Sequence, residues 1–294
     1  MISVTNCPIC GNSTFYKHLN CKDYTVSHES FEIIKCSNCS FHITSPRPDD
    51  STIGSYYLSE SYISHNNKAQ GILDRLYLLA RKYTLQWKLS LLQTYNQNSE
   101  KTLLDYGSGT GAFLEACSKN GWQTTGIEPS ENARKASKYL QLSVYQSINQ
   151  INSNKFNSIT LWHVLEHVPD LDVTLQQLKS LLSDKGTLFI AVPNFQSSDG
   201  QHYKEYWAGY DVPRHLWHFS RENMNQLMQK NGLSIINIIP MKLDAYYISL
   251  LSEKYKSPTS GLPGMILAFK NAMLSNLRAK KTGQYSSLIY IIRK

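Results

Sequence analysis

The chain has 294 residues, of which 41% are hydrophobic, and its 30 lysines and arginines exceed its 22 aspartates and glutamates, for a formal net charge of +8. This length suits one large α/β domain with a smaller unit. No apolar run approaches the roughly 20 residues of a membrane helix, and no export signal opens the sequence, so we expect a cytoplasmic protein without a transmembrane segment.

Four cysteines near the N-terminus form two Cys-x-x-Cys pairs, Cys7 with Cys10 and Cys36 with Cys39. This spacing is typical of a zinc ribbon, and four thiolates leave no open coordination position, so we expect structural zinc. About 45 residues bury too little surface to fold alone, and bound metal would supply the missing stability. The sequence therefore predicts a zinc-ribbon domain over residues 1–48.

Two alternatives to this metal site remain. Disulfides are one, although the lack of an export signal argues against them. Replacement of a ligand by Cys21, His18 or His28, which lie between the two pairs, is the other. Cys117 lies further along the chain, and we expect it to be part of the core.

Residues 49–98 are predicted to form a helical linker or cap. The stretch 51–67 is polar and rich in tyrosine. In the stretch 68–95, apolar residues recur at positions 72, 76, 79, 83 and 87, which is the spacing of an amphipathic helix. We expect this helix to join the ribbon to the following domain and to cover a cofactor pocket there.

From residue 99 onward, strand and helix patterns alternate at short spacing, as in βαβ units. Strands are predicted near 102–106, 124–128, 142–145, 157–162, 186–192, 233–240 and 287–292. Helices are predicted near 111–120, 130–140, 170–182 and 220–231. The pattern predicts a Rossmann-like α/β domain with a seven-stranded sheet over residues 99–294, interrupted by an insertion at about 241–284.

Three glycines, Gly107, Gly109 and Gly111, alternate directly after the first of these strands. They let the backbone turn sharply and approach a ligand, and the helix that follows offers unpaired N–H groups. With Glu128 about 20 residues later, the loop fits the dinucleotide fingerprint. With Asp105 before the first glycine, it also fits S-adenosylmethionine, whose sulfonium and amino group favour a nearby carboxylate. The presence of Asp105 therefore favours S-adenosylmethionine over a dinucleotide.

Five segments in the right order resemble class I S-adenosylmethionine-dependent methyltransferases of the ubiquinone-biosynthesis-like group (methyltransferase type 23) with an N-terminal zinc ribbon. They are the glycine loop and residues 126–130, 156–168, 186–194 and 213–220. The resemblance covers nearly the whole chain. It implies an enzyme that transfers methyl groups and a sheet whose last strand is antiparallel.

The resemblance also implies the cofactor site. Asp105 and the loop backbone would hold the methionine moiety, Glu128 would accept both ribose hydroxyls, and Trp162 with His163 would line the pocket floor. Gln146 stands where many relatives place an acidic residue against the adenine amino group. The expected cofactor-binding residues are Asp105, Tyr106, Gly107, Ser108, Gly109, Gly111, Phe113, Glu128, Pro129, Gln146, Trp162 and His163.

Methyl transfer from a sulfonium is a direct displacement, so the protein must align the reacting atoms and exclude water. A hydroxyl acceptor also needs a base, most often histidine. We expect four catalytic residues: His163, Glu166 and His167 after the fourth strand, and the distant His215. Their spacing is also similar to the metal site of small-RNA 2′-O-methyltransferases, so a bound divalent ion is an alternative to a base.

The segment 194–219 is predicted to be irregular and is rich in aromatic residues, namely Tyr203, Tyr206, Trp207, Tyr210 and Trp217. Long irregular stretches in compact domains are usually functional. We therefore expect a lid that stacks on a sugar or an aromatic acceptor. A satellite core is the alternative.

Residues 254–294 hold eight basic side chains and no acidic one. Such a region attracts phosphate on a nucleic acid, a nucleotide sugar, a lipid-linked pyrophosphate or an anionic membrane surface. The alternative is a solvated surface that binds no ligand. We expect a small-molecule acceptor that bears phosphate, such as a sugar or glycan intermediate. The amphipathic run 262–277 would dock a lipid-linked acceptor or a second subunit, as in a homodimer.

An RNA-modifying methyltransferase is the alternative function. In that case the zinc ribbon and the basic tail would bind phosphates of the nucleic acid. Residues 1–50, however, are not notably basic, and aromatic residues are not interleaved with lysine or arginine as a nucleic-acid-binding face would need. The sequence therefore favours the small-molecule acceptor.

Overall fold

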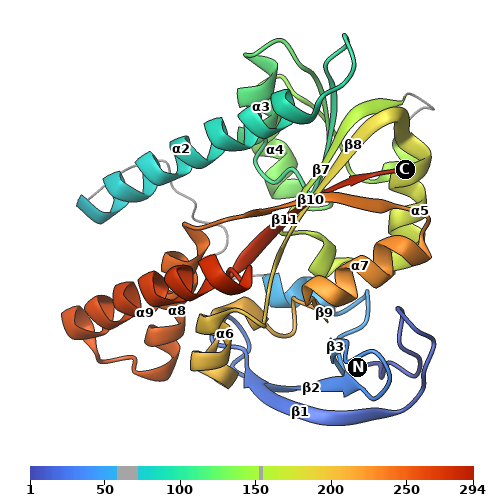
Figure 1. Ribbon diagram of the computed structural model, residues 1–294. Helices are drawn as coiled ribbons and strands as arrows, with labels where there is room; N and C mark the ends of the chain where they lie inside the picture. Colours follow the sequence, from blue (N-terminus) through green and yellow to red (C-terminus); the bar gives the residue numbers. More distant parts are fainter. Residues whose placement is uncertain (58–71, 152–154) are drawn as a thin grey trace.

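The computed structural model describes residues 1–57, 72–151 and 155–294. A seven-stranded sheet forms the centre of the molecule, and a second sheet of four strands lies beside it at the N-terminus (Figure 1). Of the predicted linker, residues 58–71 lie outside the described residues. The division of the chain at residues 48 and 98 stays a prediction.

The strand order in the central sheet is β10-β11-β8-β7-β4-β5-β6. Its parallel strands are β4 (Thr102–Tyr106), β5 (Gln123–Ile127), β6 (Ser143–Tyr145), β7 (Phe156–Trp162) and β8 (Leu182–Pro193). The last strand, β11 (Ser287–Arg293), runs antiparallel between β8 and β10 (Ser234–Pro240). The seven predicted strands and the antiparallel last strand are therefore confirmed.

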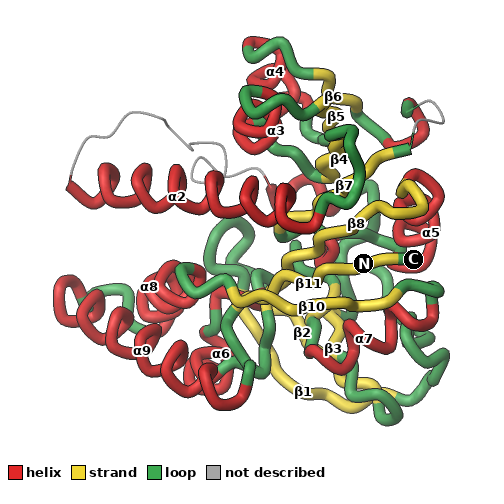
Figure 2. The backbone as a smooth tube through the Cα atoms, turned by 45° about the horizontal axis from the view of Figure 1, so that its top comes forward, coloured by secondary structure: helices red, strands yellow, loops and turns green. Residues whose placement is uncertain are grey.

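Helices cover both faces of this sheet (Figure 2). Those predicted within the α/β domain are α3 (Ala112–Ser118), α4 (Glu131–Tyr139), α5 (Leu171–Leu181) and α7 (Arg221–Lys230). The predicted linker helix is α2 (Ile72–Tyr95). Buried Leu89 and Leu92 of α2 pack with residues of α3, β4, β8 and β11, whereas α5 and α7 pack on the opposite face.

The insertion forms α8 (Asp244–Lys256) and α9 (Gly261–Thr282). These two helices lie side by side and contact the short helix α6 (Ser198–Tyr203), and all three project from one end of the sheet (Figures 1 and 2). Short 3-10 turns complete the described elements: η1 (Ile53–Tyr57), η2 (Ile148–Gln150), η3 (Leu165–His167), η4 (Lys204–Tyr206) and η5 (Ala208–Tyr210).

The N-terminal sheet contains a strand from the second half of the chain. Its order is β1-β2-β3-β9, where β1 is Phe15–Lys22, β2 is Ser30–Cys36, β3 is His42–Thr44 and β9 is Trp217–His218. β3 pairs antiparallel with β9, so that Ile43 lies opposite Trp217. Phe41 and Ile43 belong to the same buried cluster as residues of α5 and α7. The N-terminal sheet therefore shares the core of the large domain.

The aromatic segment 194–219 is a satellite core rather than an open lid. The residues Tyr203, Trp207, Tyr210 and Trp217 are at most 4% exposed. The first three pack with Phe31 of β2 and with other buried residues of the N-terminal sheet. The expectation that these four rings stack on an acceptor is wrong, because they already contact other protein side chains; only Tyr206 is half-buried.

A buried ion cluster connects this segment to the N-terminal sheet. Arg214 Nη2 donates to Asp23 Oδ1 at 3.0 Å and to Asp211 Oδ1 at 2.7 Å, and Nη1 donates to the carbonyl of Tyr56 at 2.9 Å. Burial by itself would raise the pKa of Asp23, but the hydrogen bonds from Arg214 and from backbone amides hold it well below its usual range. The ionised carboxylate therefore stabilises the folded state.

Replacing Asp23 should destabilise the protein, because the buried Arg214 would then keep only one of its two carboxylate partners, the half-buried Asp211. We expect Asp23→Asn to lower the free energy of unfolding by about 3 kcal/mol, measured by urea denaturation at neutral pH. The control is Asp184→Asn, which removes an exposed carboxylate near Lys294 and should leave the free energy of unfolding unchanged. Equal stability of the two variants would contradict a role for the buried ion cluster.

Candidate active site

The glycine loop turns at the carboxyl end of β4. The N–H groups of Gly107 and Ser108 both donate to the carbonyl of Ile127, at 2.8 and 2.9 Å, which fixes the loop against β5. Gly107 has φ +79°, and a Cβ there would lie 2.4 Å from Val164 Cγ2. At Gly109, a Cβ would meet no described atom within 4 Å. The loop backbone is therefore tightly packed at its start and accessible at its middle.

Glu128 follows β5 and faces this loop. Its Oε2 accepts from Gly109 N–H at 2.9 Å, and its Oε1 accepts from Ser130 N–H at 2.8 Å. Because each carboxylate oxygen has a further lone pair, the group can still accept two hydroxyls. Glu128 N–H donates to the carbonyl of Tyr145 at 2.9 Å, so the exposed Gln146 follows beside it. Glu128 and Gln146 thus follow the adjacent strands β5 and β6, and their roles in cofactor binding stay predictions.

Asp105 is buried at the end of β4, 2% exposed. Its Oδ1 accepts from Thr160 Oγ1 of β7 at 2.6 Å. Burial, with a smaller contribution from the charge of Glu128, raises the pKa of Asp105 to about 7. A cation bound nearby would shift the carboxyl toward its ionised form.

Lys88 of α2 is a residue that the sequence analysis missed. Its Nζ lies 4.3 Å from the centroid of the Trp162 ring, and that ring meets Phe113 edge-on at 5.4 Å. Loss of hydration lowers the pKa of Lys88, while the charges of Asp244 and Asp105 act in the opposite direction. Nothing local distinguishes Lys88 from other lysines on an amphipathic helix, because its position depends on how α2 packs on the sheet.

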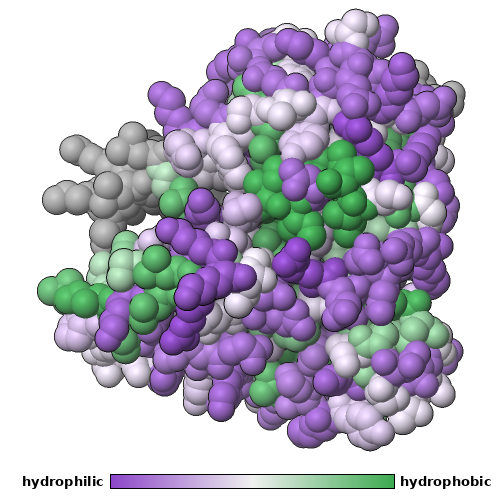
Figure 3. Space-filling model, in the orientation of Figure 1, coloured by the Kyte–Doolittle hydropathy of each residue, from purple (hydrophilic) through white to green (hydrophobic). Residues whose placement is uncertain are grey.

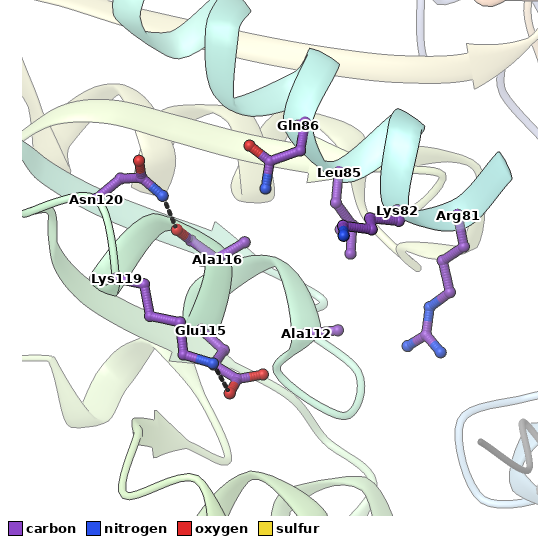
Figure 4. Close-up of a pocket in the computed structure, with 9 residues that line it drawn as sticks. All are labelled: Arg81, Lys82, Leu85, Gln86, Ala112, Glu115, Ala116, Lys119 and Asn120. Carbon is purple, nitrogen blue, oxygen red and sulfur yellow. Dashed lines mark hydrogen bonds and ion pairs between the residues drawn. The ribbon is translucent and has the colours of Figure 1, made fainter. Parts of the chain in front are cut away.

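A groove among the described residues lies beside the glycine loop rather than over it. It has a volume of about 360 Å³ and runs between α2 and α3 (Figure 4). Arg81 and Lys82 of α2 line one side, and Glu115, which pairs with Lys119 at 2.6 Å, lines the other. Ala112 is the point nearest the loop. None of the predicted site residues lines this groove.

The four predicted catalytic residues come together just beyond β7. The two atoms His163 Nδ1 and Glu166 Oε1 are 3.5 Å apart, and His215 Nε2 lies 4.0 Å from the same oxygen. The rings of His167 and His215 meet edge-on, with centroids 4.6 Å apart. One carboxylate is therefore surrounded by three imidazoles, although His215 is far away in the sequence. Their chemical roles stay predictions.

The Glu166 carboxylate is fully buried, and neither oxygen has a hydrogen-bond partner among the described residues. Burial would raise its pKa, but the neighbouring histidines lower it. His167 Nδ1 lies 2.9 Å from the carbonyl of Arg214, and His215 Nδ1 lies 2.9 Å from the carbonyl of Gly209. Nδ1–H of each ring can donate to that carbonyl, which leaves an Nε2 lone pair available.

With these lone pairs, the cluster can bind a metal ion or accept a proton. The ligand atoms of Glu166, His167 and His215 all lie within 4.8 Å of one another. Burial, aided by the charge of His215, lowers the pKa of His167 to about 4, so this imidazole is neutral. Two imidazoles and a carboxylate are suitable ligands for a divalent transition-metal ion.

Asp244, the first residue of α8, is a second residue that sequence reasoning missed. Its Oδ2 lies 3.0 Å from His163 Nε2, although the two residues are 81 positions apart. Burial alone would lower the pKa of His163, but Asp244 and Glu166 raise it to about 9. With φ +57°, His163 also has an uncommon backbone conformation for a side-chain-bearing residue. His163 is therefore an imidazolium held between two carboxylates at neutral pH.

The four N-terminal cysteines form a separate cluster. Cys7 and Cys39 have sulfurs 3.4 Å apart, those of Cys10 and Cys36 are 3.6 Å apart, and all four lie within 4.8 Å of one another. Tetrahedral zinc with bonds of about 2.3 Å requires comparable sulfur separations. Each of the four is a free thiol, and Cys21 and Cys117 are buried elsewhere.

Comparison with known proteins gives a consistent result. A family profile described as a methyltransferase domain matches residues 77–238. Ubiquinone biosynthesis O-methyltransferase of Histophilus somni is 35% identical over 116 residues, 35% of this chain and 49% of that protein. The mitochondrial ubiquinone biosynthesis O-methyltransferase of Rattus norvegicus is 28% identical over 160 residues, 47% of this chain and 46% of that protein. The chain thus spans about half the length of these curated relatives.

Solved structures show the same fold. The cyclopropane synthase of Mycobacterium tuberculosis superposes with a TM-score of 0.50, covering 85% of this chain and 100% of that one. The two sequences are 13% identical. At that identity the likeness is one of fold alone.

The raised pKa of His163 predicts a pH dependence of stability. A folded-state pKa of about 9, above the usual unfolded value near 6.5, stabilises the protein fully below about pH 6.5 and not above about pH 9. With a side chain 32% exposed, we expect a contribution on the order of 2 kcal/mol. The stability difference between wild type and His163→Gln, measured by urea denaturation in metal-free buffer, should shrink as the pH rises from 6 to 10.

The variant Asp244→Asn provides the matched control. Loss of that carboxylate should move the NMR titration of His163 toward neutral pH. An unchanged titration in this variant would contradict the assignment of Asp244 as the partner of His163.

Proposed function

Because the chain belongs to the methyltransferase-domain family, whose profile covers residues 77–238, we propose that it transfers the methyl group of S-adenosylmethionine to a hydroxyl oxygen of a small molecule. Family membership also sets aside the dinucleotide alternative. The observation that carries the proposal is the cluster around Glu166, which lies directly beyond β7 at the sheet edge that bears the glycine loop. Ligands of open α/β sheets bind at this edge.

In this proposal the cofactor lies across the glycine loop. Glu128 accepts the ribose hydroxyls, and Asp105 with the backbone near Gly109 holds the positively charged methionine end. Lys88 is placed to pair with the carboxylate of the same moiety, because its ammonium lies above the Trp162 ring. Asp105 would thus bind the positively charged end of the methionine moiety, and Lys88 would bind its carboxylate.

Methyl transfer forms a bond between the acceptor oxygen and the methyl carbon while the carbon–sulfur bond breaks. Sulfur keeps the electron pair and becomes a neutral thioether, and the acceptor loses its proton. His163 is already protonated at neutral pH, so we assign it to positioning Glu166 rather than to removing that proton. His215 and His167 have Nε2 lone pairs that can accept it.

The same residues fit a divalent cation. Glu166, His167 and His215 would hold the ion, and the Glu166 oxygens, which have no hydrogen bond among the described residues, would then gain a direct ligand contact. A bound cation would lower the pKa of the acceptor hydroxyl. Proton acceptance by a histidine and metal binding are both consistent with this arrangement, and both use the same three side chains.

The class of acceptor is inferred from several observations. Curated relatives are named as ubiquinone biosynthesis O-methyltransferases, which supports oxygen as the methylated atom. A phosphate-bearing sugar or glycan intermediate is our more specific proposal, supported by the basic region 254–294. Tyr203, Trp207, Tyr210 and Trp217 do not support it, because they are buried. RNA is disfavoured, because residues 1–50 of the N-terminal unit are not notably basic.

We further propose that Cys7, Cys10, Cys36 and Cys39 hold one structural zinc ion. Their sulfurs gather from two tight turns that flank β1 and β2. Four thiolates would fill the coordination shell, so the ion would have no open position for substrate. The metal would then fix the sheet that pairs with β9.

Two substitutions separate cofactor binding from methyl transfer. Glu128→Gln should weaken binding of S-adenosylhomocysteine about tenfold or more, measured by calorimetry, because a charged acceptor of two hydrogen bonds is lost. Glu166→Gln should preserve this affinity but lower transfer of radioactive methyl to a catechol or nucleotide-sugar panel by about a hundredfold or more.

The control for both is Glu115→Gln, which removes a half-buried carboxylate on α3 that lines the groove beside the loop but is not among the predicted site residues, and which should change neither measurement. Binding of a nicotinamide dinucleotide without binding of S-adenosylhomocysteine would overturn the proposal. Label transferred to RNA but to no small acceptor would favour the alternative function.

The zinc proposal predicts one zinc ion per purified chain, measured by atomic emission. Cys39→Ser should lower the zinc content and the thermal unfolding temperature, because the metal contributes directly to folding. Cys117→Ala, which removes a buried thiol of the large domain, should retain the metal. Full zinc content in Cys39→Ser would contradict the assigned ligands.

A further inference from the structure

The insertion helix α9 is packed with its small residues inward. Its buried positions are Gly264, Ala268, Ala272, Ser275 and Ala279. These residues let α9 approach its neighbours α6 and α8 closely. A surface helix usually turns its large apolar side chains toward the core and its polar ones outward. In α9 the buried face consists of small residues instead.

The large apolar residues of α9 are exposed to solvent. Leu267 is 43% exposed, and five others, Leu262, Ile266, Phe269, Met273 and Leu277, are 48% to 67% exposed. The spacing of these five, at three or four positions, places them along one side of the helix. Leu243, 43% exposed, lies just before α8. Figure 3 shows hydrophobic side chains gathered on the outer part of the α8–α9 pair.

Basic side chains accompany this apolar stripe. Lys270, Lys280 and Lys281 of α9 are exposed, and no acidic residue occurs from position 254 to the last residue. Two copies of this face would bring lysines together without a carboxylate from 254–294 to pair with them. A surface of anionic lipid headgroups over an apolar layer complements both the lysines and the stripe.

We propose that α9 lies flat on an anionic lipid surface. The five apolar side chains enter the boundary between headgroups and acyl chains, and the lysines contact the headgroup phosphates. None of the described helices is long and apolar enough to cross a bilayer. In this proposal α9 therefore lies in the plane of the lipid surface. The binding is independent of methyl transfer, because it uses none of the residues of the catalytic cluster.

Co-sedimentation with vesicles tests the proposal on the full chain. Wild type should bind vesicles made of equal parts phosphatidylcholine and phosphatidylglycerol, and should bind pure phosphatidylcholine much more weakly. The triple variant Ile266→Ser, Phe269→Ser, Met273→Ser should lower the partition coefficient roughly a hundredfold. Lys270→Gln, Lys280→Gln and Lys281→Gln together should lower binding to the mixed vesicles by a similar factor and reduce its dependence on salt.

The matched control is Tyr139→Ser, which removes an exposed aromatic side chain on α4 and should bind vesicles like wild type. Unchanged affinity for S-adenosylhomocysteine would show that each variant is folded. Failure of wild type to bind either vesicle, or equal binding by the apolar triple variant, would overturn the proposal. A dimer of wild type that becomes a monomer in the triple variant, measured by light scattering, would assign the stripe to a second copy instead.

Discussion

The main chain at Leu216 holds the two halves of the molecule together. Its N–H donates to the carbonyl of Glu166 at 2.8 Å, and its carbonyl accepts from Thr44 N–H at 3.1 Å. The preceding residue, His215, is further fixed because its carbonyl accepts from Thr44 Oγ1 at 2.7 Å. The imidazole of His215 is therefore positioned by the N-terminal sheet on one side and by the segment after β7 on the other. The neighbouring Arg214 reinforces this connection through Asp23.

Charged side chains alternate in sign beside the glycine loop. Glu166 and Asp244 carry negative charges, and the protonated His163 between them carries a positive charge. Lys88 interacts with the charge of Asp244. In a partly buried site such charges act more strongly than in water. The arrangement also keeps His163 protonated, whereas the imidazole of His167 beyond Glu166 is neutral. The cluster around Glu166 thus contains both the positive charge of His163 and imidazole lone pairs.

Sequence periodicity and local motifs predicted the central sheet, the glycine loop and the position of Glu128, because these depend on neighbouring residues in the chain. They did not predict Lys88 or Asp244, which reach the site only through the packing of α2 and α8. The aromatic segment was misinterpreted for a related reason. Aromatic residues are equally common in cores and on ligand-binding surfaces, and only the position of the N-terminal sheet determines that Trp207 and Tyr210 are buried.

The late position of β9 in the chain constrains the order of synthesis and folding. Thr44 and His218, which bond across β3 and β9, are 174 positions apart. During translation the cysteine-bearing sheet emerges with the edge of β3 unpaired until the ribosome has made most of the protein. An unpaired edge is prone to intermolecular pairing, and contacts between distant residues form slowly. Nascent chains therefore pass through an interval in which chaperone protection of this edge would favour correct assembly.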